Sequence, residues 1–263
     1  MTLVMGILNV TPDSFSDGGR YFGAERAIEH GLALRAQGAD ILDIGGESTR
    51  PGAERISAQE EQDRVLPVIS ALRKEGIAVS IDTLNAATAL SAAAAGATII
   101  NDVSGGLADP DILHTVAGTE LTYILGHWRN GSTQMDARAN YGDVVADVRS
   151  ELQARVRAAK EAGISDAQLV LDPGLGFSKI GTQNWQLLRR QSEFAQLGYR
   201  VMIGASRKRF LGDLLADGAD VEERDLPTAI VSVLSAQQGA WAVRVHNVEQ
   251  TRAALDTVAA WNS

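Results

Sequence analysis

The fold is decided by a short apolar run that first reads LVMGILNV, at residues 3–10, and then recurs along the chain. Each run is rich in leucine or β-branched residues and has Gly, Asp or Asn at or near one of its ends, which is typical of buried parallel strands. The further runs are DILDIGG (40–46), AVSIDT (78–83), ATIINDV (97–103), LTYILGH (121–127), QLVLDPG (168–174), VMIGAS (201–206) and AVRVHN (242–247). We therefore expect eight buried strands.

Segments with the hydrophobic period of an amphipathic helix lie between these runs. Examples are residues 24–38, 57–76, 141–163 and 247–261. Several end in a glycine that directly precedes the next run, as expected where a helix stops on a left-handed residue. These glycines are Gly38, Gly76, Gly163 and Gly198. Eight such units in 263 residues predict an α/β fold, a (β/α)8 TIM barrel that forms a single domain over residues 1–263.

An open, doubly wound sheet is the alternative that can be built from the same units. Folds of that kind usually have fewer strands and carry a glycine-rich turn after the first strand. The segment that follows the first run here reads NVTPDSFSDGG (9–19), which contains no G-x-G-x-x-G pattern. The closed barrel is therefore favoured.

The composition is that of an ordinary globular protein, with 45% hydrophobic and 22% charged residues. A formal net charge of −9 argues against nucleic acid or an anionic membrane surface as the main partner, but it leaves room for a local anion site. The absence of cysteine excludes disulfides, thiolate metal sites and cysteine nucleophiles, and it fits a reducing compartment. Because no signal peptide and no membrane-spanning run is present, we expect a cytoplasmic protein.

Polar residues stand where the predicted strands end. In a parallel barrel the catalytic groups come from the carboxyl ends of the strands and from the loops that follow them. A single Asp or Asn there can equally cap the next helix, but polar residues at all eight ends indicate a site. These residues are Asn9, Glu47, Asp82, Asn101, His127, Asp172, Ser206, Arg244 and His246.

Arg244 and His246 are two residues apart, so both side chains point to the same face of a strand. Two basic groups that face a barrel interior are costly unless they meet negative charge. A bound phosphate or carboxylate explains them better than a buried salt bridge, which remains the alternative. This pair therefore predicts an anion site.

The segment GASRKRFLG (204–212) provides a second indication of an anionic ligand. It places Arg207, Lys208 and Arg209 at the start of a helix, where the helix dipole disfavours cations and free backbone N–H groups favour anions. Successive helical residues point in different directions, so all three cannot reach one ligand. We expect at least one of them to be an ordinary solvated base.

Two long loops rich in Gly and Pro follow the first two runs, at residues 11–23 and 46–57. Loops of this length after adjacent barrel strands are typical of lids that close over a substrate and exclude water. Their residues that can act chemically or pack on an aromatic ring are Phe15, Asp17, Thr49, Arg50 and Pro51.

Asp82 and Asp172, together with the amide of Asn101, end three of the inner strands. Carboxylates can accept paired N–H donors from a heterocycle, and an amide both donates and accepts. This set suits an aminopyrimidinone-type ring better than a sugar. No His and carboxylate spacing predicts a metal site, and His30 and His114 fall in helical segments, where we expect them at the surface.

The residues assembled above resemble those of the dihydropteroate synthase family. The matching segments extend over nearly the whole chain and fall at seven of the eight strand ends, so the resemblance is far more specific than one short motif. They are GILNVTPDSFSDGG (6–19), DIGGESTRPGA (43–53), SIDT (80–83), NDVSGG (101–106), LDPGLGFSK (171–179), GASRKRFLG (204–212) and RVHNV (244–248).

The resemblance implies a transferase of folate biosynthesis and a target of sulfonamides. Its reaction would condense 6-hydroxymethyl-7,8-dihydropterin diphosphate with p-aminobenzoate, giving 7,8-dihydropteroate and diphosphate. The resemblance also implies Mg²⁺ as cofactor and a homodimer. The small-molecule substrates are the expected partners, with no nucleic acid and no membrane.

Site roles follow from the resemblance, position by position. The catalytic residues would be Asp17, Asp82 and Lys208. The pterin would be bound by Asp82, Asn101, Asp172 and Lys208. The diphosphate would be bound by Asn9, Arg50, Arg244 and His246, with Asn9 as the metal ligand. The p-aminobenzoate side would include Phe15, Thr49, Pro51, Phe177 and Ser206. His127 and Glu47 are left as structural residues.

Two positions depart from the family pattern. Gly126 stands where relatives commonly have Met, and we expect the missing side chain to widen the floor of the pocket. Arg209 stands where many relatives have Ser, and we assign it no role. Two alternatives remain: a non-catalytic paralogue that binds pterin, which Gly126 favours, and a pterin-dependent methyltransferase of the same superfamily. The two lid segments and the SRK segment argue against the methyltransferase.

Overall fold

The computed structural model describes residues 1–11, 19–47, 55–129 and 139–263. Its strands form a closed parallel barrel in which each strand pairs with the next along the chain and β8 pairs with β1. The strands are β1 (Leu3–Asn9), β2 (Ile41–Gly45), β3 (Ala78–Asp82), β4 (Ile99–Asp102), β5 (Thr122–Gly126), β6 (Leu169–Asp172), β7 (Arg200–Ile203) and β8 (Ala242–Val245). The eight expected strands and the predicted closed barrel are confirmed.

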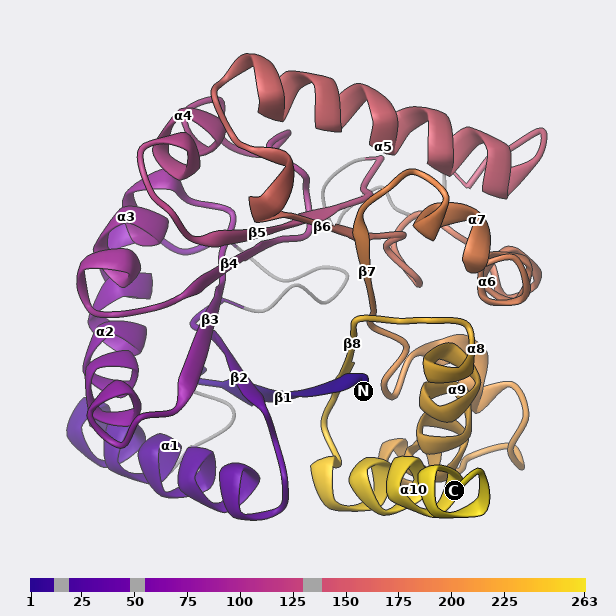
Figure 1. Cartoon of the computed structure of the whole chain (residues 1–263). Helices are drawn as coiled ribbons and strands as arrows, with labels where there is room; N and C mark the ends of the chain where they lie inside the picture. Colours follow the sequence, from indigo (N-terminus) through magenta and orange to yellow (C-terminus); the bar gives the residue numbers. More distant parts are fainter. Residues whose placement is uncertain (12–18, 48–54, 130–138) are drawn as a thin grey trace.

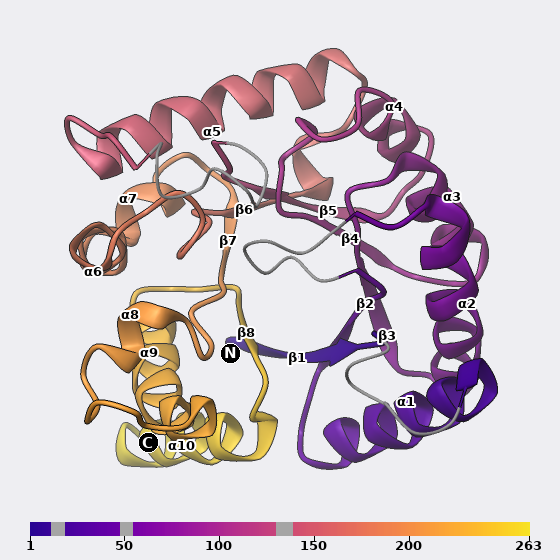
Figure 2. The same ribbon diagram turned by 180° about the vertical axis from the view of Figure 1, so that it is seen from behind.

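Helices surround the barrel on its outside, as Figures 1 and 2 show from opposite sides. They are α1 (Gly19–Ala36), α2 (Ala58–Lys74), α3 (Ala86–Ala94), α4 (Ile112–Ala117), α5 (Val144–Glu161), α6 (Gly181–Arg189), α7 (Ser192–Ala195), α8 (Arg209–Gly212), α9 (Asp225–Gln237) and α10 (Val248–Trp261). Two short 3-10 turns, η3 (Asp166–Gln168) and η4 (Val221–Arg224), precede β6 and α9. Among these helices, as far as the chain is described, none is long and apolar enough to cross a membrane.

The alternation of strands and helices is less regular in the second half of the chain than the sequence predicts. β6 is followed by both α6 and α7, and β7 is followed by the four-residue α8 before α9 begins. The predicted glycine stops are confirmed, because Gly38, Gly76, Gly163 and Gly198 have φ angles of 103°, 74°, 105° and 87°. Each of these values lies in the left-handed region, which glycine enters without steric cost.

Alternation along each strand divides the apolar residues between two cores. In β2, Leu42 and Ile44 belong to the large cluster packed between the barrel and its helices, whereas Ile41 belongs to a smaller cluster inside the barrel. The buried members of the smaller cluster are Met5, Ile41, Ile99, Ile124, Val170, Met202 and Ala242. The amino-terminal half of the barrel interior is therefore filled by apolar side chains.

The interior becomes polar two residues further along four of these strands. Because side chains alternate, the residue two positions after each inner apolar residue also faces inward. Those positions hold Asp43 after Ile41, Asn101 after Ile99, Asp172 after Val170 and Arg244 after Ala242. The fold thus places a polar layer on an apolar one, at the carboxyl ends of the strands.

The smaller cluster inside the barrel leads to a prediction about stability. Met202 is fully buried within it. Replacing it with Ala leaves a cavity, so Met202→Ala is expected to lower the free energy of unfolding by about 2–5 kcal/mol. Leu90→Ala, at a side chain of α3 that is 58% exposed, is the matched control and should change it by less than about 0.5 kcal/mol. Equal losses in denaturant titrations of the two variants would contradict the assignment of Met202 to the core.

Candidate active site

The predicted polar residues gather at the carboxyl end of the barrel. Asn9, Asp82 and Asp172 are the last residues of β1, β3 and β6, and Asn101 is the third residue of β4. The structure also describes Phe177, Ser206, Lys208, Arg244 and His246. The lid residues Phe15, Asp17, Thr49, Arg50 and Pro51 lie outside the described residues.

Asp43 links the two sides of this polar layer. Its carboxylate is fully buried, and its Oδ2 accepts hydrogen bonds from Arg244 Nε at 2.5 Å and from Asn101 Nδ2 at 3.0 Å. Arg244 also donates from its second nitrogen to Asp82 Oδ2 at 2.7 Å. One guanidinium thus connects carboxylates of β2 and β3 from its place on β8.

The sequence analysis missed Asp43 as a site residue. A signal was present, because a carboxylate stands inside the apolar run DILDIGG, two residues after the inward-facing Ile41. The argument that Arg244 needs a bound anion was also wrong. Asp43 and Asp82 already balance its charge, so the salt bridge that we kept as the alternative is the arrangement found. Whether Arg244 also binds diphosphate stays a prediction.

Burial changes the acid–base properties of this layer. It raises the pKa of Asp82 to about 7, and the neighbouring Arg244 opposes this shift only in part. Burial also lowers the pKa of Lys208 to about 8, against the attraction of Asp172. Both groups can therefore gain or lose a proton near neutral pH.

Three buried oxygen atoms on adjacent strands have no hydrogen-bond partner within the described part of the chain. They are Asp43 Oδ1 on β2, Ser80 Oγ on β3 and Asn101 Oδ1 on β4. Buried polar atoms left unpaired are costly, so such atoms usually face a ligand or ordered water. The barrel mouth therefore presents acceptors to a molecule that carries N–H donors.

Lys208 and Phe177, which come from different loops, meet at this mouth. The Lys208 ammonium lies 4.7 Å from the centroid of the Phe177 ring and donates to the carbonyl of Leu175. Nearby, Asp172 Oδ1 accepts from the backbone N–H of Gly174 at 2.8 Å. The loop after β6 thus forms a wall that holds the predicted pterin lysine.

Ser206 orients His246. Its Oγ accepts from the backbone N–H of His246 at 3.0 Å and lies 2.9 Å from the ring Nδ1. When the hydroxyl donates its proton to Nδ1, the ring proton resides on Nε2. His246 then carries an N–H donor on Nε2.

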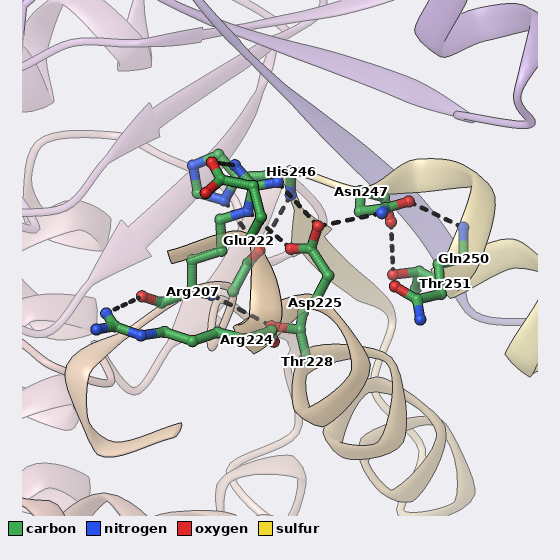
Figure 3. A network of polar contacts seen from close by, with 10 residues as sticks. Arg207, Glu222, Arg224, Asp225, Thr228, His246, Asn247, Gln250 and Thr251 are labelled. Carbon is green, nitrogen blue, oxygen red and sulfur yellow. Dashed lines mark hydrogen bonds and ion pairs between the residues drawn. The ribbon is translucent and has the colours of Figure 1, made fainter. Parts of the chain in front are cut away.

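Arg207 has a structural role, shown in Figure 3. Its guanidinium makes two hydrogen bonds to Asp225, at 2.7 and 2.8 Å, and Asp225 also accepts from Asn247 at 3.1 Å. The backbone N–H of Arg207 donates to Thr228, and its carbonyl accepts from Arg224. Arg207, whose own φ is 57°, therefore fixes the turn after β7. The turn is held against α9 and the start of α10.

This finding corrects the anion argument drawn from Arg207, Lys208 and Arg209. The charge of Arg207 is balanced by Asp225 and requires no bound ligand. The helix in question, α8, has only four residues, so its dipole gives little reason to expect an anion. Of the three residues, only Lys208 is shown to reach the barrel mouth.

The residues set aside as structural have partners in the protein. Glu47 forms an ion pair with Arg55, with 2.7 Å between Oε1 and Nε. His127 lies 2.8 Å from Glu151 through Nε2 and 2.9 Å from Lys179 through Nδ1. His30 and His114 are exposed, as predicted.

The expectation that Gly126 widens the pocket floor was wrong. A Cβ at this position would lie 2.6 Å from both Cα and O of Val103. The backbone after β4 therefore occupies the space that a side chain at position 126 would need. Gly126 permits a close approach of two chain segments and leaves no enlarged cavity.

Comparisons with known proteins agree on one family. The family described as Pterin binding enzyme matches residues 5–246. Dihydropteroate synthase of Mycobacterium leprae is 51% identical, with 98% of this chain and 93% of the relative covered. The same enzyme of Bacillus subtilis is 44% identical, with 95% and 85% covered.

Solved structures give the same result. Xanthomonas albilineans dihydropteroate synthase with 4-aminobenzoic acid has a TM-score of 0.92 and 42% identity, with 100% of this chain and 93% of the other covered. The Yersinia pestis enzyme with a sulfonamide drug has a TM-score of 0.92 and 40% identity, with 99% and 94% covered. Both similarities extend over the whole barrel.

The close approach at Gly126 leads to a prediction. A methyl group there would push against the Val103 backbone, so Gly126→Ala is expected to lower the free energy of unfolding by about 1–3 kcal/mol. Gly142→Ala is the matched control, since a Cβ there would meet no atom within 4 Å. Chemical denaturation of both variants tests this. Unchanged stability of Gly126→Ala would show that the β4 backbone yields freely.

Proposed function

The chain belongs to the pterin binding enzymes, and we propose that its barrel mouth divides into a pterin floor, a diphosphate side and a p-aminobenzoate side. The reaction is the dihydropteroate synthase reaction of folate biosynthesis. It joins 6-hydroxymethyl-7,8-dihydropterin diphosphate to p-aminobenzoate, giving 7,8-dihydropteroate and diphosphate. The chain is therefore a transferase.

The pterin floor consists of Asp82, Asn101 and Asp172, with Lys208 at its edge. The observation that carries this assignment is the unpaired buried oxygen of Asn101, which lies in a row with the unpaired oxygens of Asp43 and Ser80 on the neighbouring strands. A pterin ring presents N–H donors along its pyrimidinone edge, and carboxylate and amide oxygens accept them. Lys208 supplies a donor for the ring's own acceptors.

Binding of the ring would also affect Arg244. This guanidinium is shared between Asp43 and Asp82. A ring that donates to Asp82 competes for the same carboxylate, so Arg244 gains a free N–H donor on the side of the leaving group. The proposed roles of Arg244 toward the protein and toward diphosphate are therefore compatible.

The diphosphate side comprises Asn9, His246 and Arg244, with Arg50 from the second lid. The Nε2–H of His246 and the Arg244 guanidinium are donors suited to phosphate oxygens. Mg²⁺ would be held by Asn9, whose Oδ1 and the Oδ2 of Asp82 both lie 3.8 Å from where a Cβ at Gly45 would be. Mg²⁺ prefers oxygen ligands and usually takes only one or two of them from the protein, with waters and substrate phosphates as the others. The amide oxygen of Asn9 fits that preference.

The p-aminobenzoate side contains Phe177 and Ser206, joined by Phe15, Thr49 and Pro51 of the lids. Phe177 offers a ring face, and the Lys208 ammonium above it offers a positive charge close to a carboxylate-bearing substrate. An aromatic acid fits this combination of ring and cation.

The mechanism follows from the charges of the residues. As the C–O bond breaks, its electron pair moves to the diphosphate, where His246 and Arg244 donate hydrogen bonds to the growing negative charge. Bound Mg²⁺ supplies further neutralisation of that charge. The methylene carbon becomes positive, and the buried carboxylates Asp82 and Asp172 stabilise it. The amine lone pair then forms the new C–N bond, and the amine loses a proton, for which Asp17 is the acceptor in this proposal.

The division of roles is tested with two variants. Asp17→Ala is expected to lower kcat by on the order of a hundredfold and to leave pterin affinity nearly unchanged, because the lid acts after the pterin is bound. Asp82→Asn removes a charged acceptor of the ring and should weaken pterin binding by roughly tenfold or more. Diphosphate release and calorimetric pterin binding measure the two effects.

Controls for that experiment separate the alternatives. Equal losses of kcat and pterin affinity in Asp17→Ala would contradict its lid role. Wild-type protein that binds pterin without releasing diphosphate would indicate the non-catalytic paralogue. Activity that survives a chelator and does not respond to added Mg²⁺ would remove the metal assignment to Asn9.

A homodimer formed through α9 is the quaternary structure that we favour. Leu226, Ile230 and Leu234 repeat every four residues on this helix, so they share one face, and they are 58%, 52% and 52% exposed. An exposed apolar stripe of this kind is typical of a subunit contact.

The cysteine-free composition also supports the cytoplasm as the compartment.

The dimer surface is tested by charge introduction. Ile230→Asp buries a carboxylate in the proposed contact and is expected to shift the protein from dimer to monomer at micromolar concentration in light scattering. Leu90→Asp on α3 has similar exposure and should leave the dimer intact. A monomeric wild type, or a dimer that persists in Ile230→Asp, would contradict this surface.

A further inference from the structure

The loop between β6 and α6 contains several residues in the left-handed backbone conformation, which contacts from the rest of the protein must hold in place. Within five residues, Gly174, Gly176 and Ser178 have φ angles of 66°, 75° and 51°. Ser178 has a side chain, so its left-handed conformation costs free energy and persists only where the surroundings impose it. This loop carries Leu175 and Phe177, which contact Lys208.

Lys179 is a second lysine that holds this loop. Its side chain is only 3% exposed, and its Nζ donates to the carbonyls of Gly174 and Phe177, both at 2.8 Å. The third contact is His127 Nδ1, at 2.9 Å. An ammonium has three N–H donors, so these three acceptors satisfy Lys179 completely.

His127 is itself fixed as an acceptor for Lys179. Its Nε2 lies 2.8 Å from Glu151 Oε2, and a carboxylate there requires the ring proton on Nε2. Nδ1 is then left with a lone pair that faces the Lys179 ammonium. Arg129 in turn holds Glu151 through its Nε at 3.0 Å. The chain of contacts therefore extends from α5, through the end of β5, to the loop.

Three carbonyls of the loop are divided between two lysines. Those of Gly174 and Phe177 accept from Lys179, whereas that of Leu175, between them in sequence, accepts from Lys208. Rotation of these peptide groups would change both sets of bonds together. The place of the Lys208 ammonium thus depends on the backbone that Lys179 holds.

We propose that Lys179 is a positioning residue for the transferase reaction, which sets the β6–α6 loop so that Leu175 and Phe177 hold Lys208 at the substrate. This inference rests on the proposed roles of Lys208 and Phe177. Lys179 does not itself face the substrate, since all three of its donors are used within the protein. Its action passes through the peptide groups of the loop.

A double-mutant cycle tests this coupling. Lys179→Met keeps an unbranched side chain one atom shorter but removes the three donors. It should lower kcat/KM for p-aminobenzoate by on the order of tenfold to a hundredfold, as a displaced catalytic group does. In a Lys208→Met background the same change should have little further effect, because the group that it positions is gone. Additive losses across the cycle would overturn the proposal.

A readout independent of activity separates this inference from the proposed function. Hydrogen exchange of the amides at 174–180 should be faster in Lys179→Met and unchanged in Lys160→Met, a control lysine of α5 that pairs with Asp166 at the surface. Unchanged exchange in Lys179→Met would refute the positioning role. If Lys179→Met does not fold, Lys179→Gln, which keeps two N–H donors, replaces it in both experiments. Wild-type protein without transferase activity would instead contradict the proposed function.

Discussion

The ion pairs of Arg244 with Asp43 and Asp82 are the interaction on which the barrel mouth depends. A cation and two carboxylates can lie inside a barrel only if each meets an opposite charge, and here one guanidinium from β8 serves carboxylates from β2 and β3. The apolar layer below excludes water from this arrangement. Removing Arg244 would leave two buried carboxylates without an opposite charge at the centre of the molecule.

This arrangement also makes the mouth responsive to a ligand. Asp43, Asp82 and Asp172 outnumber the cations Arg244 and Lys208 around it, and burial raises the pKa of Asp82 to about 7. In the proposed reaction, a ring with N–H donors would supply what the carboxylates lack, and a methylene carbon that becomes positive would be stabilised by the same excess of negative charge.

Local pattern predicted the barrel and most of its polar ends, since strand alternation and glycine stops are written in neighbouring residues. It failed where the deciding contact comes from far along the chain. Asp43 lies 201 residues from Arg244, and Arg207 finds Asp225 eighteen residues later, so neither pairing was visible. The prediction of a wider pocket floor at Gly126 failed for the same reason, because backbone atoms of Val103 fill the space beside it. The roles taken from the family resemblance stay predictions, and those on Asp17 and Arg50 fall outside the described residues.

The β6–α6 loop has a consequence for selection under an inhibitor. A side chain at Gly174 would meet the carbonyl oxygen of His127 at 2.1 Å, and one at Gly176 would meet Lys208 at 2.9 Å. The carbonyls of Gly174, Leu175 and Phe177 accept hydrogen bonds from two lysines, Lys179 and Lys208. Substitution of either glycine therefore damages the fold before it alters what binds, and an inhibitor that contacted Phe177 would meet few viable escape mutations at these two positions. Resistance would have to arise elsewhere around the mouth, where side chains have fewer structural duties.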